Sequence, residues 1–252
     1  RSYRTELYTP LTYAEGDGGY DGKGYLLWAP HVMYNLKTDK WVYYGSTSSW
    51  GSQRSAIFMC ENSTDDVTGP YTFVEDIYES RKGNHPNAID ACVYYTYDNE
   101  TNAPASVDNP LNMVYGSWST SGNDCIYHKT LNADGTTPNL STAGSEICRA
   151  IDSSLEGASD DESGEGCYVV YENGYYYLYV SYGQNTGSYV ERVFRSTSPT
   201  GPFVGFNGVT ALDTSTHKVH GNQILGPFNS SLYGYIMVST GHNSVAKTVS
   251  LD

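Results

Sequence analysis

The chain has 252 residues, which is enough to bury a substantial hydrophobic core. Its 25 tyrosines and 26 glycines favour short strands and turns, and no long segment carries apolar residues at helical spacing. A formal charge of −14 without a basic stripe argues against a nucleic-acid-binding protein, and the absence of any run of eighteen apolar residues excludes a membrane-spanning helix.

Three pairs of predicted strands along the chain share one pattern. In each pair, an apolar strand that opens on a polar or aromatic residue precedes a strand rich in Tyr or Val that ends in small residues. The pairs are WAPHVMYN with KWVYYGSTS, NAIDACVYY with LNMVYGSWS, and GEGCYVVYE with YYYLYVSYG. The second strands align at Ser46, Ser117 and Ser181, so the repeat spacings are 71 and 64 residues.

Turn signals separate these strands. Asn173-Gly174 supplies the two positive φ angles of a tight β-hairpin, so we predict a hairpin between the strands of the third pair. The first and third units also carry a Gly-Pro-aromatic turn, at Gly69-Pro70-Tyr71 and Gly201-Pro202-Phe203. A fourth opening strand is expected to begin at Gly241, in GHNSVAKTVS.

Repeats of this length, built from several strands each, are typical of a β-propeller. Blades packed on both sides should have strands that are apolar on both faces. Asp90, Glu165 and His242 mark the openings of three predicted inner strands, so we expect them to converge on a central channel. The alternative for any one of them is a solvated residue at a strand end.

The five cysteines include no CxxC pair, so a structural zinc site is not expected. Cys125 and Cys148 are plausible disulfide partners, although the spacing leaves the pairing open. The abundant tyrosines and tryptophans suit stacking against sugar rings, with core packing as the alternative.

The ordered motifs LLWAPHVMYN, TGPYTFVEDI, NAIDACVYY, MVYGSWS, EGCYVVYENG, RVFRSTSPTGPFV and GHNSV resemble those of glycoside hydrolase family 43, above all its endo-α-1,5-L-arabinanases. The resemblance runs from about Leu26 to Val245. It implies an all-β fold, a five-bladed β-propeller whose first and last blades are incomplete in this sequence. Residues 1–252 are then one propeller domain, truncated at both ends.

The resemblance implies an inverting mechanism that uses three acids. Glu165, in GEG, matches the general acid, and Asp90, in NAID, matches the carboxylate that orients the acid and raises its pKa. The general base is expected on an inner strand well upstream of Trp28. Asp17 and Asp21 are the only aspartates before Trp28, and we interpret them as residues of a Gly-rich loop.

The same resemblance implies a set of substrate-binding residues: Trp28, His31, Asn87, Ser117, Trp118 and Tyr182. His242 matches a histidine that holds a metal, usually calcium, in the central channel through water; a merely hydrogen-bonded His242 is the alternative. The chain departs from the family pattern at three positions. His31 replaces an Asp, and Ala91 and Cys167 each replace a Pro.

Two functions follow from this pattern. The first is a secreted glycoside hydrolase that cleaves α-1,5-linked arabinan or a related pentose polymer with inversion of configuration. The second is a non-catalytic propeller that binds glycans or serves as an extracellular structural module. The expected partner in both cases is a neutral plant-type polysaccharide or oligosaccharide, and we expect a monomer. The motifs leave endo or exo action open.

Overall fold

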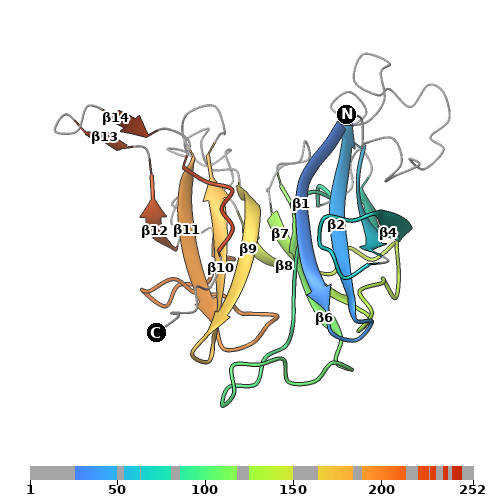
Figure 1. Cartoon of the computed structure of the whole chain (residues 1–252). Helices are drawn as coiled ribbons and strands as arrows, with labels where there is room; N and C mark the ends of the chain where they lie inside the picture. Colours follow the sequence, from blue (N-terminus) through green and yellow to red (C-terminus); the bar gives the residue numbers. More distant parts are fainter. Residues whose placement is uncertain are drawn as a thin grey trace.

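The computed structural model describes residues 26–49, 54–62, 64–80, 86–117, 125–149, 164–183, 189–213, 221–226, 228–230, 235–237 and 240–245. Within these residues the protein is all-β, with antiparallel strands and no helix (Figure 1). It follows that the described part of the chain contains no helix able to cross a membrane.

Three four-stranded antiparallel sheets follow one another along the chain, and each is a meander of consecutive strands. The first contains β1 (Leu26–Asn35), β2 (Lys40–Ser49), β3 (Arg54–Asn62) and β4 (Tyr71–Ser80). The second contains β5 (Cys92–Tyr94), β6 (Leu111–Tyr115), β7 (Cys125–Leu131) and β8 (Ser145–Arg149). The third contains β9 (Gly164–Glu172), β10 (Tyr175–Tyr182), β11 (Val190–Ser196) and β12 (Asn222–Leu225). β13 (Phe228–Ser230) and β14 (Tyr235–Met237) form a separate hairpin. The three predicted strand pairs are the first two strands of the three sheets.

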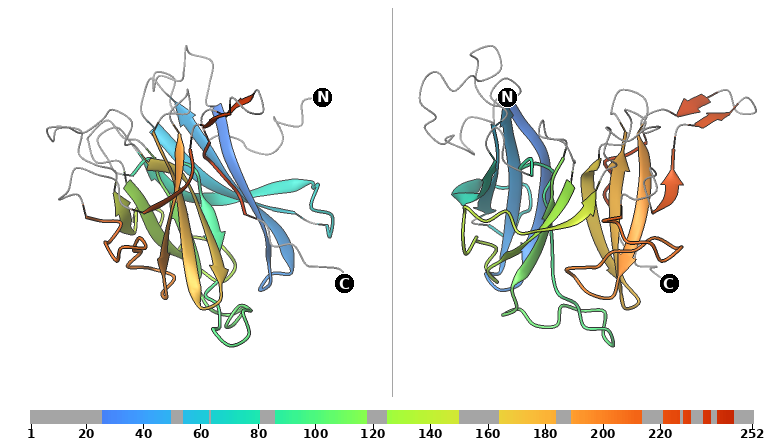
Figure 2. Two further views of the ribbon diagram at one scale, coloured as in Figure 1. Left: turned by 90° about the vertical axis from the view of Figure 1, so that its left-hand side faces the viewer. Right: turned by 180° about the vertical axis from the view of Figure 1, so that it is seen from behind.

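The second sheet packs between the first and the third (Figure 2). One core cluster joins the first two sheets and includes Tyr44, Met59 and Met113. Another joins the second and third sheets and includes Val114 and Leu178. The opening strands also meet, because β1 contacts β5 and β5 contacts β9.

Burial on both faces, which the repeat predicted, is confirmed for the first two strands of the second sheet. Every residue of β5 and β6 is buried. In the third sheet the prediction is wrong, because β9 and β10 alternate between buried and half-buried residues. Among the described residues, a neighbouring sheet packs against one face of the third sheet, which explains the alternation.

The predicted turns are confirmed. Asn173 and Gly174 have φ angles of 49° and 82°, and the hairpin pairs Tyr175 with Glu172. The two Gly-Pro-aromatic turns also share one geometry. Each has a cis Gly-Pro peptide, and Gly69 and Gly201 have φ angles of 102° and 87°.

Two other expectations are wrong. The strand expected from Gly241 is not formed over the described residues 240–245, where His242 has a φ of 54° and donates its backbone N–H to Ser181 Oγ. The disulfide between Cys125 and Cys148, one of the pairings that the sequence left open, is also not formed, since the Cys148 thiol is free. The Cys148 Sγ lies 2.9 Å from the Tyr182 hydroxyl, and in the β7–β8 ladder Cys148 faces Ile126.

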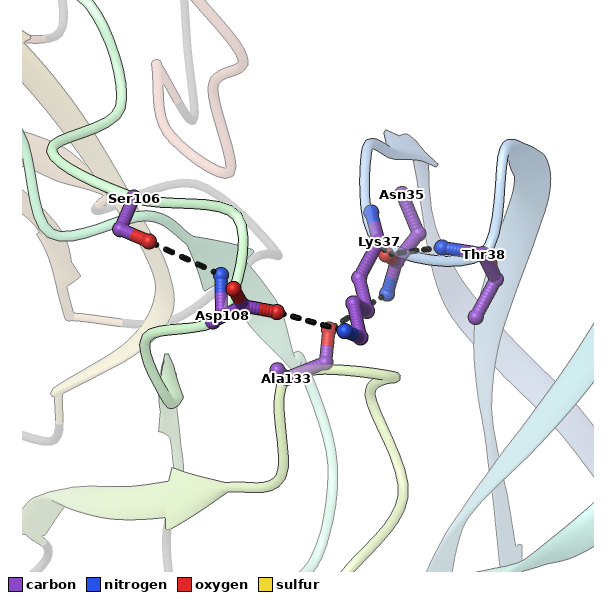
Figure 3. Close-up of polar contacts among 6 residues, drawn as sticks. All are labelled: Asn35, Lys37, Thr38, Ser106, Asp108 and Ala133. Carbon is purple, nitrogen blue, oxygen red and sulfur yellow. Dashed lines mark hydrogen bonds and ion pairs between the residues drawn. The ribbon is translucent and has the colours of Figure 1, made fainter.

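The first and second sheets are fastened together at the ends of β1 and β7 (Figure 3). Asn35 is fully buried, and its Nδ2 donates a hydrogen bond of 3.1 Å to the Ala133 carbonyl. The Asn35 Oδ1 accepts hydrogen bonds from the backbone N–H groups of Lys37 and Thr38. An exposed ion pair between Lys37 and Asp108 lies beside them. The opposite ends of the sheets, where β1 and β9 begin, carry the candidate site (Figure 1).

Candidate active site

Asp90 and Glu165 meet although 75 residues separate them in the sequence. Glu165 is the second residue of β9, and Asp90 lies just before β5. Asp90 Oδ2 accepts a hydrogen bond of 3.0 Å from the backbone N–H of Gly166, the residue that follows Glu165. The contact between β5 and β9 therefore brings both acids to one place, at the start of two opening strands.

Two hydroxyl groups fix the carboxyl group of Glu165. Ser117 Oγ donates a hydrogen bond of 2.5 Å to Oε2, and the Tyr189 hydroxyl donates one to Oε1. Ser117 and Tyr189 are buried, whereas Glu165 is half-buried. A carboxyl group held at both oxygens by rigid, buried partners has a defined direction, which proton transfer to a substrate requires.

Asp90 is buried and has a φ of 59°, a left-handed conformation that costs free energy in a non-glycine residue. Burial raises the pKa of Asp90 to about 6. The nearby His242 lowers this pKa, the negative charge of Glu165 raises it, and the hydrogen bond from Gly166 lowers it. A strained, buried carboxyl group that interacts with two other titratable groups is typical of a functional site.

Gly166 allows the segment around His242 to approach Glu165. Its φ is 60°, and a Cβ atom at this position would lie 3.1 Å from the Cα and Cγ of His242 and from Ser181 Oγ. Only glycine has both the conformation and the small size that this contact needs. Through it, the exposed His242 lies beside the two acids.

The other predicted substrate-binding residues differ in their surroundings. Trp28 is half-buried on β1, and the Asn87 Oδ1 accepts a hydrogen bond from Ser55 Oγ. His31 Nε2 lies 3.0 Å from the Val93 carbonyl, and its ring packs edge-on against Tyr168.

Tyr182 does not line the site. It is 1% exposed, so it packs in the core, which was the alternative for each aromatic residue. Trp118, Asp17 and Asp21 lie outside the described residues.

Sequence reasoning did not identify Tyr189, which binds Glu165, or Glu191, which accepts a hydrogen bond from Ser181 Oγ. Both lie in the segment YVERVFRS at the start of β11. Their relation to Glu165 depends on the pairing of β9, β10 and β11, and a sequence does not display strand register. The tyrosine content of 25 residues also gives no reason to select Tyr189.

The described residues do not by themselves form a calcium site around His242. They contain no group of three or more His, Cys, Asp or Glu side chains placed to hold a metal ion. Calcium prefers six to eight oxygen ligands, and an exposed imidazole supplies none. The imidazole of His242 itself would therefore contact a calcium ion through water.

Residues 9–249 match the family model described as glycosyl hydrolases family 43. "Probable arabinan endo-1,5-alpha-L-arabinosidase A" of Aspergillus flavus is 30% identical over 234 residues, which cover 86% of this chain and 64% of the relative. "Extracellular endo-alpha-(1->5)-L-arabinanase 2" of Bacillus subtilis is 29% identical over 249 residues, which cover 86% of this chain and 47% of the relative. The crystal structure of an endo-1,5-alpha-L-arabinanase from Thermotoga petrophila RKU-1 is similar with a TM-score of 0.65 and 28% identity, over 86% of this chain and 49% of the other. The chain thus spans less than two thirds of the length of these relatives.

Proposed function

Because the chain belongs to glycosyl hydrolase family 43, we propose that it hydrolyses α-1,5-linked arabinan or a related pentose polymer with inversion of configuration. The observation that carries this proposal is the hydrogen bond from the Gly166 amide to Asp90, which places a second carboxyl group beside Glu165. The names of the similar proteins, which are arabinanases, support the substrate class.

In the proposed mechanism, Glu165 is the general acid that protonates the leaving glycosidic oxygen. Ser117 and Tyr189 aim its carboxyl group, and Asp90 orients the segment that carries it. An inverting site also needs a base roughly 6.5–9.5 Å from the acid, with room for the attacking water. We assign this base to none of the described residues.

We also propose that the three sheets are successive blades of a five-bladed β-propeller formed by a single domain. The opening strand of each sheet contacts the opening strand of the next sheet, β1 with β5 and β5 with β9. Blades around a channel are arranged in this way. Trp28, His31, Asn87 and Ser117 would line the substrate subsites at the mouth of this channel. A calcium ion in this channel would contact His242 through water.

Two of the three residues that depart from the family pattern, Cys167 and Ala91, lie next to the proposed orienting acid. The Cys167 thiol donates a hydrogen bond of 3.4 Å to the Asp90 carbonyl, so it helps to hold the backbone of the orienting acid. Ala91 is buried beside it. The polysaccharide would be extracellular, and the name of the Bacillus subtilis relative supports a secreted protein.

The test is the variant Glu165→Gln, assayed for release of arabino-oligosaccharides from linear arabinan. We expect turnover to fall by about 10²–10⁴-fold, because the amide cannot donate the proton, while binding of arabinan changes little. Glu172→Gln, at the far end of the same strand, is the matched control and should keep turnover.

Wild-type turnover in Glu165→Gln would refute the assignment of the general acid. A wild-type protein that binds arabinan without cleaving it would instead support the non-catalytic, glycan-binding alternative.

A further inference from the structure

We propose that Glu191 is a positioning residue that, through Ser181, holds the Gly241–His242 turn against the acid-bearing end of β9. The inference rests on the proposed function, since it gives Glu191 a part in placing the general acid. No motif in the sequence singles out this glutamate.

The first evidence is the strand register. Ser181 on β10 pairs directly with Glu165 on β9 and with Glu191 on β11. Directly opposed residues of antiparallel strands point to the same side of the sheet. Glu165, Ser181 and Glu191 therefore form a row across three strands, with the serine between the two acids.

The second evidence is the hydrogen bonding of Ser181. Its Oγ donates to Glu191 Oε2 over 2.8 Å and accepts the backbone N–H of His242 over 2.5 Å. A hydroxyl group has one proton, so donation to Glu191 directs the oxygen lone pairs toward His242. Glu191 thereby fixes the orientation in which Ser181 can bind the turn.

The third evidence is the tight packing of the turn. A Cβ atom on Gly241 would lie 2.7 Å from the Tyr189 ring and 2.8 Å from Ser181 Oγ. Thr240 Oγ1 donates a hydrogen bond of 3.3 Å to the Tyr189 carbonyl, and the Tyr189 hydroxyl binds Glu165. Displacement of the turn would thus also displace Glu165, because the turn contacts both Tyr189, which binds Glu165, and Gly166, which follows it.

The burial of Glu191 indicates a role beyond packing. Its side chain is fully buried, and its Oε1 has no hydrogen-bond partner among the described residues. A buried carboxyl group costs free energy that an aliphatic side chain would not cost. Burial raises the pKa of Glu191 to about 7, and both its protonated and its ionised form offer an oxygen to Ser181.

The experiment compares Glu191→Leu, Glu191→Gln, Ser181→Ala and the double variant Glu191→Leu/Ser181→Ala. Ser46→Ala is the matched control, because Ser46 is the equivalent buried serine of the first sheet and its hydroxyl has no partner among the described residues. Two quantities are measured: kcat and KM on linear arabinan, and hydrogen exchange of the backbone amides in residues 240–245.

We expect Glu191→Leu and Ser181→Ala each to lower kcat by about ten- to a hundredfold with little change in KM, because the acid is displaced. Both should lose exchange protection in the turn, and the double variant should be no worse than either single variant. Glu191→Gln keeps an acceptor oxygen and should retain kcat and protection. Ser46→Ala should behave as wild type.

Full kcat and full protection in Glu191→Leu would overturn the inference, as would a Glu191→Gln variant as impaired as Glu191→Leu. If Glu191→Leu does not fold, Glu191→Gln and Ser181→Ala test the inference. Equal kcat and equal exchange protection in these two variants would overturn it. A wild-type protein without turnover refutes the proposed function instead, and the exchange data alone then decide whether Glu191 holds the turn.

Discussion

The three aligned serines show how one repeat position acquires different uses. Ser46 Oγ has no hydrogen-bond partner in the described part of the first sheet. Ser117 donates to Glu165, and Ser181 binds both Glu191 and the turn at His242. The sequence predicted their alignment but could not predict their partners, because each partner comes from a different strand or loop.

Gly166 gives a prediction at the residue scale. Gly166→Ala should lower turnover at least about tenfold, because the new methyl group must displace His242 or Ser181. Gly174→Ala is its control, since Gly174 also has a positive φ, 82°, but a Cβ atom added there would meet no atom within 4 Å. Both variants should lose about 1 kcal/mol of stability from backbone strain.

Thermal unfolding and arabinan assays of the two glycine variants separate these effects. Equal turnover in Gly166→Ala and Gly174→Ala would contradict the tight contact between β9 and His242.

At the scale of elements, local patterns predicted local structure well. Asn173-Gly174 predicted a hairpin because the turn depends only on its own backbone angles. Tyr182 and Cys148 were less predictable, because contacts between the second and third sheets decide their surroundings. Over the described residues 240–245, the strand expected from Gly241 does not form for the same reason, since Ser181 on another strand binds the backbone N–H of His242.

His31 links three opening strands, because it lies on β1, contacts the Val93 carbonyl on β5 and packs against Tyr168 on β9. Burial lowers the pKa of His31 to about 4. Between pH 6.5 and 4 the unfolded chain binds a proton that the native imidazole does not bind, so His31 makes the native state less stable as the pH falls through this window.

The variant His31→Gln tests this effect, because glutamine can donate to the Val93 carbonyl but does not titrate. We expect the free energy of unfolding of the wild type to fall by about 2–3 kcal/mol more than that of His31→Gln between about pH 7 and pH 4. Urea unfolding at the two pH values measures the difference. Parallel pH dependence of the two proteins would show that the native imidazole is not held neutral.

For the whole molecule, the repeat predicted the first two strands of three sheets in the correct order, and the first two strands of the middle sheet are buried on both faces as expected. The sequence could not predict the hydrogen bonds that join the first sheet to the second. Asn35 is polar and yet fully buried, because it binds the Ala133 carbonyl, 98 residues away, and caps its own turn (Figure 3).

The site is likewise a property of the whole fold, because its groups come from segments that lie far apart in the sequence. Asp90 precedes the second sheet, Glu165 belongs to the third, Tyr189 directly precedes β11 of the third, and His242 lies beyond it. Packing of β5 against β9 brings them together. The proposed chemistry therefore depends on the sheets being stacked in this order.

The most direct test is the configuration of the sugar first released from linear arabinan, followed by proton NMR during the reaction. A general acid at Glu165 with a water-activating base on the opposite side of the sugar predicts that the new reducing end appears first as the β-anomer. First release of the α-anomer would require a nucleophilic carboxylate close to the acid, and it would contradict the proposed site.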